Sequence, residues 1–399
     1  MTRFIIFALL ILSLNGYAQN PVILLSIDGF SHKYLAQYKP KNLLSLANQG
    51  IMADGMTPVF PSKTFPNHLS IVTGMYPAKH GIVHNKFYNK KLHKQYSLGA
   101  GKNNSAWLTA NPIWAVAEEK GFKSAIYFWP ESEAMVNGVL PSHYFPYKHN
   151  EPNINRINQI INWLKLPSIE RPNFIAGYFS TIDDAGHRFG PNSKEVAEAI
   201  LNIDTLIGTL IKRIKSETTA TPNIIIVSDH GMTPIDKTLV INWKSLLSNY
   251  SKLNVINGQT QLYIYEEDKK VLNDVRSHLS NVSSKHQFEI MDKSNYPDHW
   301  HFNVNNAVVP DMVINALPPT IFVSEKSHIG SATHGYDAKY NADLSAIFIA
   351  HGPDLKNKVI INSFESIHVF SLIESLLGLP LSTDVDSDIN VLSNITNRH

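Results

Sequence analysis

Four stretches of the sequence place acidic and histidine side chains beside apolar runs. The runs VILLSI, NFIAGYF and NIIIVS are each followed by such side chains, and a fourth group lies shortly before the apolar run SAIFIA. The side chains are Asp28, Asp183 with His187, Asp229 with His230, and His334. Carboxylates and imidazoles are the ligands that zinc and other divalent ions take in proteins. Together these groups therefore indicate a metal site.

Each group taken alone also has an ordinary structural interpretation. Asp28 fits a tight turn, the aspartate pair at 183–184 fits a turn or a helix cap, and the segment 333–335 is too short to be diagnostic. Asp183 and His187 would point the same way on a helix, although their spacing is common by chance. The combination is more informative, because ligands of open α/β sheets gather at the carboxyl ends of parallel strands.

A candidate nucleophile lies in the segment FPSKTFPNHLSIVTG. Thr64 stands two residues before Pro66 at a predicted helix start, where backbone N–H groups and the helix dipole favour an anionic oxygen or a bound phosphate. A threonine hydroxyl is a weak nucleophile at neutral pH, and coordination to a cation would activate it. The alternative is that Thr64 only caps the helix.

Alternating strands and helices must position these groups. Continuous apolar runs predict buried strands at 21–30, 123–129, 173–179, 223–229 and 345–352. Amphipathic segments predict helices at 40–50, 111–121, 154–166, 193–215 and 364–377. This alternation predicts an α/β fold with a mostly parallel sheet and helices on both faces. From 238 to about 332 the alternation stops, which predicts a small inserted α+β cap of the kind that often shapes a substrate pocket.

The N-terminus and the composition indicate where the protein acts. Residues 1–18 combine Arg3, an apolar run over 4–14 and a small-residue site at 16–18, which predicts a secretory signal peptide followed by a mature chain over 19–399. The chain has no cysteine, which favours a bacterial periplasmic or secreted protein and excludes thiolate ligands. We expect no membrane anchor after cleavage. With 35 basic and 33 acidic residues and no basic run, we expect no stable nucleic-acid complex.

The ordered motifs identify a family. The segments SIDGF, FPSKTFPNHLSIVTGMYPAKHGIVHN, YFSTIDDAGHRFGP, VSDHGM and THGYD closely resemble the nucleotide pyrophosphatase/phosphodiesterase family of the alkaline phosphatase superfamily. The resemblance covers nearly the whole mature chain and implies an alkaline-phosphatase-like fold that holds two zinc ions. For the first zinc it implies the ligands Asp28, Thr64, Asp229 and His230. For the second zinc it implies the ligands Asp183, His187 and His334.

The resemblance also implies roles for the substrate-binding residues. Thr64 would be the catalytic nucleophile, and Asn85 would donate its amide to a phosphoryl oxygen. The nucleobase would lie against Phe65 and Tyr178, with Leu98 and Trp129 as further candidates, whereas the alternative for Tyr178 is core packing in a strand. Glu131 departs from the family, which often has glycine after Trp-Pro, and this departure bears on the choice of substrate.

The resemblance implies a secreted two-zinc phosphodiesterase. It would cleave nucleotide phosphodiester or pyrophosphate bonds to nucleoside monophosphates through a phosphothreonine intermediate. A choline-phosphodiester or lysophospholipid phosphodiesterase of the same family is the alternative, because its metal site would look the same. A non-catalytic ligand-binding homologue is the third interpretation, although no ligand of the family is missing from this sequence.

Overall fold

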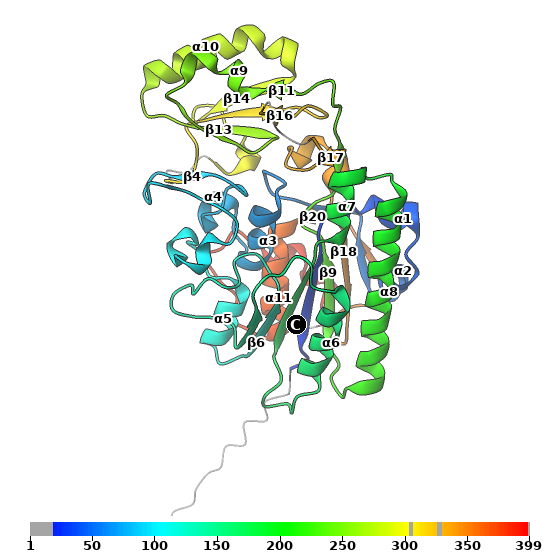
Figure 1. Cartoon of the computed structure of the whole chain (residues 1–399). Coiled ribbons are helices and arrows are strands. Elements are labelled where there is room, and N and C mark those ends of the chain that lie inside the picture. The colour runs from blue at the N-terminus through cyan, green and yellow to red at the C-terminus, as the bar shows by residue number, and fades with distance from the viewer. Residues whose placement is uncertain (1–18, 303–305, 325–328, 398–399) are drawn as a thin grey trace, which may run out of the picture.

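The computed structural model of the chain describes residues 19–302, 306–324 and 329–397 (Figure 1). The signal peptide expected over 1–18 lies outside these residues. The described chain forms a large sheet covered by helices, and a smaller sheet with its own helices lies beyond one end of the large one (Figure 1). Among the described residues, no helix has both the length and the apolar composition needed to cross a membrane.

The large sheet has eight strands, and all of them except β18 run in the same direction. In order across the sheet they are β19 (Val359–Ile361), β2 (Ile51–Ala53), β18 (Phe348–His351), β9 (Asn223–Val227), β1 (Val22–Ile27), β8 (Phe174–Phe179), β6 (Ser124–Tyr127) and β7 (His143–Phe145). Every residue of β1, β8 and β9 is buried, as expected for strands covered on both faces. The predicted mostly parallel α/β sheet is confirmed.

Helices cover both faces of the sheet, and β1 shows how one strand serves both layers. Its residues Ile23 and Leu25 belong to one apolar cluster, whereas Val22 and Leu24 belong to the other, because successive side chains of a strand point to opposite faces. The first layer contains α1 (Lys33–Tyr38), α2 (Lys41–Gln49), α6 (Asn153–Leu164) and α8 (Lys194–Glu217). The second contains α3 (Thr64–Thr73), α4 (Pro77–His80), α5 (Ile113–Glu119) and α11 (Val369–Leu377) (Figure 1).

The pairing of the central strands brings distant parts of the chain to one edge of the sheet. Strand β1 lies between β8 and β9, with Ile27 opposite Phe179 and Ser26 opposite Val227. The chain segments that follow these three strands therefore leave the sheet side by side. Helix α7 (Thr181–Phe189) begins there, directly after β8.

The smaller sheet is antiparallel and has its own apolar core. It consists of β12 (Asn254–Asn257), β13 (Gln261–Tyr265), β15 (Met312–Ala316) and β14 (Phe288–Asp292). Helices α9 (Trp243–Leu246) and α10 (Lys269–His286) and the pair β11 (Ile241–Asn242) and β16 (Phe322–Val323) accompany it. All of these elements fall within residues 238–332, and Figure 1 shows them above the large sheet.

Short strand pairs connect the remaining segments. They are β3 (Met56–Thr57) with β20 (Phe364–Glu365), β4 (Tyr88–Asn89) with β5 (Lys94–Gln95), and β10 (Thr233–Pro234) with β17 (Ala332–Thr333). The helix predicted over 364–377 begins only at Val369, because its first two residues pair with β3. Pairing with a distant strand decides this start, and a local pattern does not contain that information.

Candidate active site

The predicted acidic residues lie at the carboxyl ends of three adjacent strands. Asp28 directly follows β1, and Asp229 comes two residues after β9. Asp183 lies in the first turn of α7, which follows β8. The sequence segment STIDDAGHRFG is thus a helix rather than a loop, and it carries Asp183 to the edge where β1 and β9 end.

The predicted histidines surround these carboxylates. His187 lies one turn after Asp183 on α7, and its Nε2 is 3.5 Å from the Oδ2 of that aspartate. His334 follows β17 and brings its Nε2 to 3.8 Å from the Oδ1 of Asp183. The Nε2 of His230 lies 2.9 Å from the Oδ2 of Asp229, and the His230 and His334 rings stack with centroids 3.5 Å apart.

Backbone contacts fix the protonated nitrogen of each of these three rings. In each ring Nδ1 faces a backbone carbonyl oxygen, which can only accept, so Nδ1 carries a proton and Nε2 is the nitrogen directed at the carboxylates. The distances are 3.0 Å from His187 to Ala332, 2.9 Å from His230 to Gly231 and 2.8 Å from His334 to Ser62. Burial and the neighbouring His230 also hold the pKa of His334 well below its ordinary value, which keeps its ring neutral.

The carboxylates present oxygens that have no hydrogen-bond donor. Among the described residues, the buried oxygens Asp28 Oδ1, Asp183 Oδ1 and Asp229 Oδ2 have no hydrogen-bond partner. Burial raises the pKa of Asp28 well above its ordinary value, and repulsion from Asp229 and Asp183 adds to this shift. Three converging carboxylates with free lone pairs are unfavourable by themselves and become favourable around cations.

The residues present therefore fit divalent metal ions. Two sets of ligand atoms each lie within 4.8 Å of one another. One set is Asp183, His187 and His334, and the other is Asp28, Asp183 and His230. The first set matches the ligands expected for the second zinc. The second set differs from the ligands expected for the first zinc, because it includes Asp183 and lacks Thr64 and Asp229. Asp183 belongs to both sets. Asp229 lies next to the second set, since its Oδ2 is 2.9 Å from the Nε2 of His230.

Thr64 lies at the edge of this cluster. It is the first residue of α3, with Lys63 as the N-cap, and its Oγ1 is 3.5 Å from the Nε2 of His230. The backbone N–H of Phe65 donates to the Oδ1 of Asn85 at 2.9 Å. This bond orients the Asn85 amide so that its Nδ2 hydrogens have no protein partner among the described residues and remain able to donate to a ligand.

A cavity of about 510 Å³ extends from the metal-ligand cluster to an aromatic wall. All four predicted nucleobase contacts line it, but in different ways. Leu98 is 56% exposed, whereas Tyr178 is 8% exposed and donates its hydroxyl to the Oδ2 of Asp28 at 2.6 Å. The indole N–H of Trp129 donates to the backbone oxygen of His68 at 3.2 Å. Tyr178 and Trp129 thus line the cavity and also form hydrogen bonds within the surrounding structure.

The cavity lining contains several carboxyl groups. The described residues that line the cavity include five with carboxyl groups, which are Asp28, Glu131, Glu133, Asp183 and Asp184. Among the described residues, the lining contains no lysine or arginine and no residue of the segment 238–332 that was expected to shape the pocket. Such a lining repels an anionic phosphate unless bound cations reverse its potential.

Two residues of the site were missed by the sequence reasoning. Tyr147 lines the cavity, is 47% exposed and lies edge-on to Tyr178 with ring centroids 6.0 Å apart. It belongs to no motif, so the sequence offered no signal for it. His68 is fully buried, and its Nδ1 lies 2.9 Å from the Thr64 backbone oxygen and 3.4 Å from the Oδ2 of Asp229. Its position four residues after Thr64 was a usable signal.

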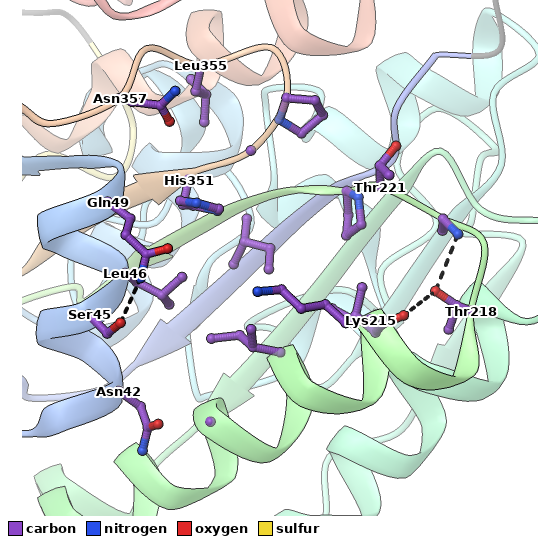
Figure 2. A pocket seen from close by; sticks show the side chains of 18 of the residues that line it. Asn42, Ser45, Leu46, Gln49, Lys215, Thr218, Thr221, His351, Leu355 and Asn357 are labelled. Carbon is purple, nitrogen blue, oxygen red and sulfur yellow. Dashed lines mark hydrogen bonds between the residues drawn. The ribbon is translucent and has the colours of Figure 1, made fainter.

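A second hollow, of about 650 Å³, lies away from this site (Figure 2). Figure 2 shows Ser45 and Gln49 of α2 on one side and Lys215 and Thr218 on the other. None of the predicted site residues lines this hollow, and the described residues of its lining include no carboxylate side chain. It therefore lacks the ligands that a divalent ion requires, in spite of its larger volume.

Comparisons with known proteins identify the family of the chain. The sequence profile described as "Type I phosphodiesterase / nucleotide pyrophosphatase" matches residues 22–337. The chain is 34% identical over 372 residues to ectonucleotide pyrophosphatase/phosphodiesterase family member 1 of Rattus norvegicus, with 90% of this chain and 41% of the relative covered. It is 34% identical over 380 residues to the venom phosphodiesterase of Naja atra, with 92% of this chain and 45% of the relative covered. The chain thus spans less than half the length of these relatives.

Solved structures give the same result for the fold. Murine ectonucleotide pyrophosphatase/phosphodiesterase 5 superposes with a TM-score of 0.87 at 27% identity, covering 94% of this chain and all of that one. An inactive threonine-to-alanine variant of that protein in complex with AMP gives the same TM-score at 26% identity, covering 95% of this chain and all of that one. The predicted family and fold class are confirmed. The chain belongs to the type I phosphodiesterase/nucleotide pyrophosphatase family.

Proposed function

We propose that this chain is a two-zinc phosphodiesterase that hydrolyses nucleotide phosphodiester or pyrophosphate bonds to nucleoside monophosphates. The observation that carries the proposal is the composition of the cavity. Thr64 shares the cavity with unpaired carboxylate oxygens and with aromatic side chains, and the described residues of the lining include no lysine or arginine. A phosphate can bind beside these carboxylates only if metal ions neutralise them.

Zinc bound by the carboxylates and histidines would supply positive charge and would lower the pKa of a coordinated hydroxyl. In the proposed reaction, the Thr64 oxygen forms a bond to phosphorus while the bond to the leaving oxygen breaks on the opposite side. The N-terminus of α3 stabilises the anionic oxygens. The Asn85 amide, oriented by the Phe65 N–H, donates to one non-bridging oxygen. Attack by water on the resulting phosphothreonine releases the monoester.

The same lining favours diesters over monoesters. A phosphate monoester carries a second negative charge at neutral pH, and its recognition requires an additional cation. Asn85 is uncharged, and the buried Lys63, which is not among the described lining residues, donates its Nζ to the backbone oxygen of His334 at 2.6 Å. A diester has one charge fewer, and its second ester group can gain binding free energy from the aromatic wall.

A nucleotide fits this wall better than a choline or lysophospholipid group. Phe65, Trp129, Tyr147 and Tyr178 line the cavity, and stacking on aromatic rings contributes about 1–3 kcal/mol per base. The murine relative in complex with AMP supports this choice of ligand. Choline could also lie against aromatic rings, so a choline phosphodiester is the second candidate. A purely binding role is disfavoured because the nucleophile and every expected ligand are present.

Two further proposals concern the whole protein. The segment 238–332 would be a cap inserted in the phosphodiesterase domain, since it contains the smaller sheet with its own apolar core. The mature protein would act in the bacterial periplasm or outside the cell, because the first 18 residues have the composition of a secretory signal. N-terminal sequencing of the protein from the producing cells and from their medium tests this location.

A substrate panel tests the proposed function. The zinc-loaded protein is assayed with p-nitrophenyl thymidine monophosphate, p-nitrophenyl phosphate, a dinucleotide and glycerophosphocholine. We expect catalytic efficiency on the nucleotide diester to exceed that on the monoester by at least about a hundredfold, because one uncompensated charge is removed. Equal efficiency on both nitrophenyl substrates would contradict the diesterase proposal. Preferential hydrolysis of glycerophosphocholine would favour the second candidate.

A further inference from the structure

The turn after β6 holds a buried carboxyl group that the proposed chemistry does not use. Glu131 lines the cavity but is only 5% exposed. Phe128 and Glu131 have φ angles of 62° and 60°, so two non-glycine residues of one short turn adopt the left-handed region. That region is unfavourable for residues with a Cβ atom, and it persists only where surrounding contacts enforce it.

Two hydrogen bonds hold the Glu131 carboxylate in place. The Tyr96 hydroxyl donates to Oε1, and the backbone N–H of Gly101 donates to Oε2 at 2.9 Å. A Cβ atom on Gly101 would lie 2.2 Å from Oε2, so the carboxylate can approach this closely only because position 101 is glycine. Burial raises the pKa of Glu131 to about 7, while both donors oppose the shift by stabilising the anion.

These two hydrogen bonds attach the segment 96–101, which we call the Leu98 wall, to the turn after β6, which forms another wall of the cavity. Leu98 and Gly99 line the cavity and belong to the same short segment as Tyr96 and Gly101. Leu98 is largely exposed, so its own side chain adds little apolar packing, and the wall is anchored by the buried Tyr96 ring and its hydrogen bond to Glu131. A further connection between the wall and the turn is the Lys102–Glu133 ion pair at 2.7 Å, which is partly exposed and therefore weak.

The hydrogen bond between Tyr96 and Glu131 also connects this turn to Phe65, the residue next to Thr64. The Tyr96 ring stacks on Phe87 with centroids 4.8 Å apart and lies edge-on to Phe65 at 6.4 Å. Phe65 directly follows Thr64 and lines the cavity. A movement of Tyr96 would therefore change the part of the cavity wall formed by the Phe65 ring as well as the wall at Leu98.

We infer that Glu131 is a positioning residue that determines which diesters this cavity accepts. Its carboxylate holds the Leu98 wall against Trp129 and Pro130 and so sets the width of the cavity beside the larger ester group. This inference rests on the proposed function, because it assigns a determinant of selectivity to the same cavity. Glu131 acts on a substrate only through the position of the cavity walls, so replacing Glu131 affects only substrates that contact these walls.

The test compares two substrates with the same leaving group in the zinc-loaded full chain. The larger is p-nitrophenyl thymidine monophosphate, and the smaller is methyl p-nitrophenyl phosphate, whose methyl group is too short to reach the Leu98 wall. For Glu131→Ala we expect kcat/KM on the nucleotide to fall by about tenfold, mainly through KM, because a disordered wall must be ordered at each binding event. We expect the value on the methyl ester to stay within about twofold.

Two conservative variants separate positioning from charge. In Glu131→Gln the amide oxygen can accept from Gly101 N–H while the amide nitrogen donates to the Tyr96 oxygen, so we expect the nucleotide KM to be restored to within about threefold of wild type. Tyr96→Phe removes one donor without changing the ring, and we expect an intermediate increase of KM. If Glu131→Ala fails to fold, Tyr96→Phe carries the test.

Glu118→Ala is the matched control. Glu118 accepts hydrogen bonds from Ser124 and Ser142 at the beginning of β6, so it is a comparable carboxylate tether at the end of the strand away from the cavity. We expect this variant to be less stable, with an unchanged nucleotide KM. An increase of KM in Glu118→Ala equal to that in Glu131→Ala would overturn the inference, because general loosening would then explain both.

AMP binding by calorimetry separates a failure of the inference from a failure of the proposed function. Unchanged AMP affinity in both Glu131→Ala and Tyr96→Phe would overturn the inference alone. A Glu131→Gln variant as impaired as Glu131→Ala would also overturn it, because the negative charge would then be what matters. Absence of diester hydrolysis by wild type would overturn the proposed function, and the AMP affinities of the variants would still decide whether Glu131 positions the wall.

Discussion

The two ends of the cavity are built in different ways. At the metal-ligand end, Asp28 and Asp229 follow adjacent central strands, and backbone carbonyls fix the tautomers of the histidines. At the wall end, Leu98 and Tyr147 lie on exposed connections between elements, and the bonds of Glu131 hold the connection that carries Leu98. The first end is therefore rigid because the sheet is rigid, whereas the second is adjustable by single substitutions.

This difference assigns chemistry and selectivity to separate parts of the molecule. Moving a ligand at the first end would require the end of a buried strand to move, which disturbs the core. Changing the second end requires only that a loop contact be altered. We therefore expect substitutions at the first end to affect all phosphodiester substrates, and substitutions at the second to affect substrates with a large ester group.

Removal of metal tests the first end most severely. We expect the purified protein to contain close to two zinc ions per chain and to lose activity on exhaustive chelation, with recovery when zinc is added. Because three buried carboxylate oxygens lack partners, we also expect chelation to lower the free energy of unfolding by about 3–4 kcal/mol or more. Metal analysis and thermal unfolding measure both effects. Full activity without bound metal would contradict the proposed site.

A pair of adjacent aspartates provides the control for metal binding. Asp183 belongs to both candidate ligand sets, whereas the neighbouring Asp184 belongs to neither. Asp183→Ala should therefore reduce the zinc content, while Asp184→Ala should keep it. Equal zinc loss in the two variants would mean that the general negative charge of the cavity, and not a defined ligand set, binds the metal.

Replacement of the nucleophile should abolish turnover but leave the rest of the first end intact. We expect Thr64→Ala to lower kcat by about 10⁴-fold or more, because the attacking oxygen is removed. Zinc content and AMP affinity should remain close to wild type, since the carboxylates and histidines are unchanged. Thr64→Ser keeps a hydroxyl and should retain measurable turnover. An active alanine variant would mean that water attacks phosphorus directly.

The same contrast explains what the sequence could predict. The ligands follow uninterrupted apolar runs, and the parallel alternation implies that such strand ends meet, so the sequence alone was enough to place Asp28, Asp183 and Asp229 together. The antiparallel direction of β18 could not be predicted, because a short apolar run has no directional signal. Tyr147 and the bonds of Glu131 depend on contacts between loops distant in sequence, which local patterns do not encode.

At the wall end, we expect the largest effect from the ring of Tyr147. Tyr147→Ala should weaken AMP binding by about 1–3 kcal/mol, because a stacking surface is lost. Tyr147→Phe should retain most of the affinity, since the ring remains. Tyr144→Ala is the matched control, because Tyr144 is an exposed tyrosine of the same segment that does not line the cavity. Calorimetry with AMP measures all three, and a normal affinity of Tyr147→Ala would remove this residue from the nucleobase contacts.

The smallest expected effect concerns the pH dependence of stability at Glu131. Burial raises the pKa of this carboxyl from 4.5 to about 7, so between these values the folded protein holds a proton that the unfolded chain has released. The stabilisation from this proton is fully present below about pH 4.5 and is lost as pH rises through about 7. In a Glu131→Gln variant the glutamine does not titrate, and wild type and variant have the same metal ligands.

The difference in unfolding free energy between wild type and Glu131→Gln should therefore isolate this group. Wild type should lose on the order of 2 kcal/mol relative to the glutamine variant between pH 5 and pH 8.5, which paired denaturant titrations at both pH values would detect. A difference that stays constant with pH would mean that the carboxyl is already ionised in the folded protein at pH 5. The two hydrogen bonds from Tyr96 and Gly101 would then outweigh burial, and the tether would be an anion throughout the range in which the enzyme works.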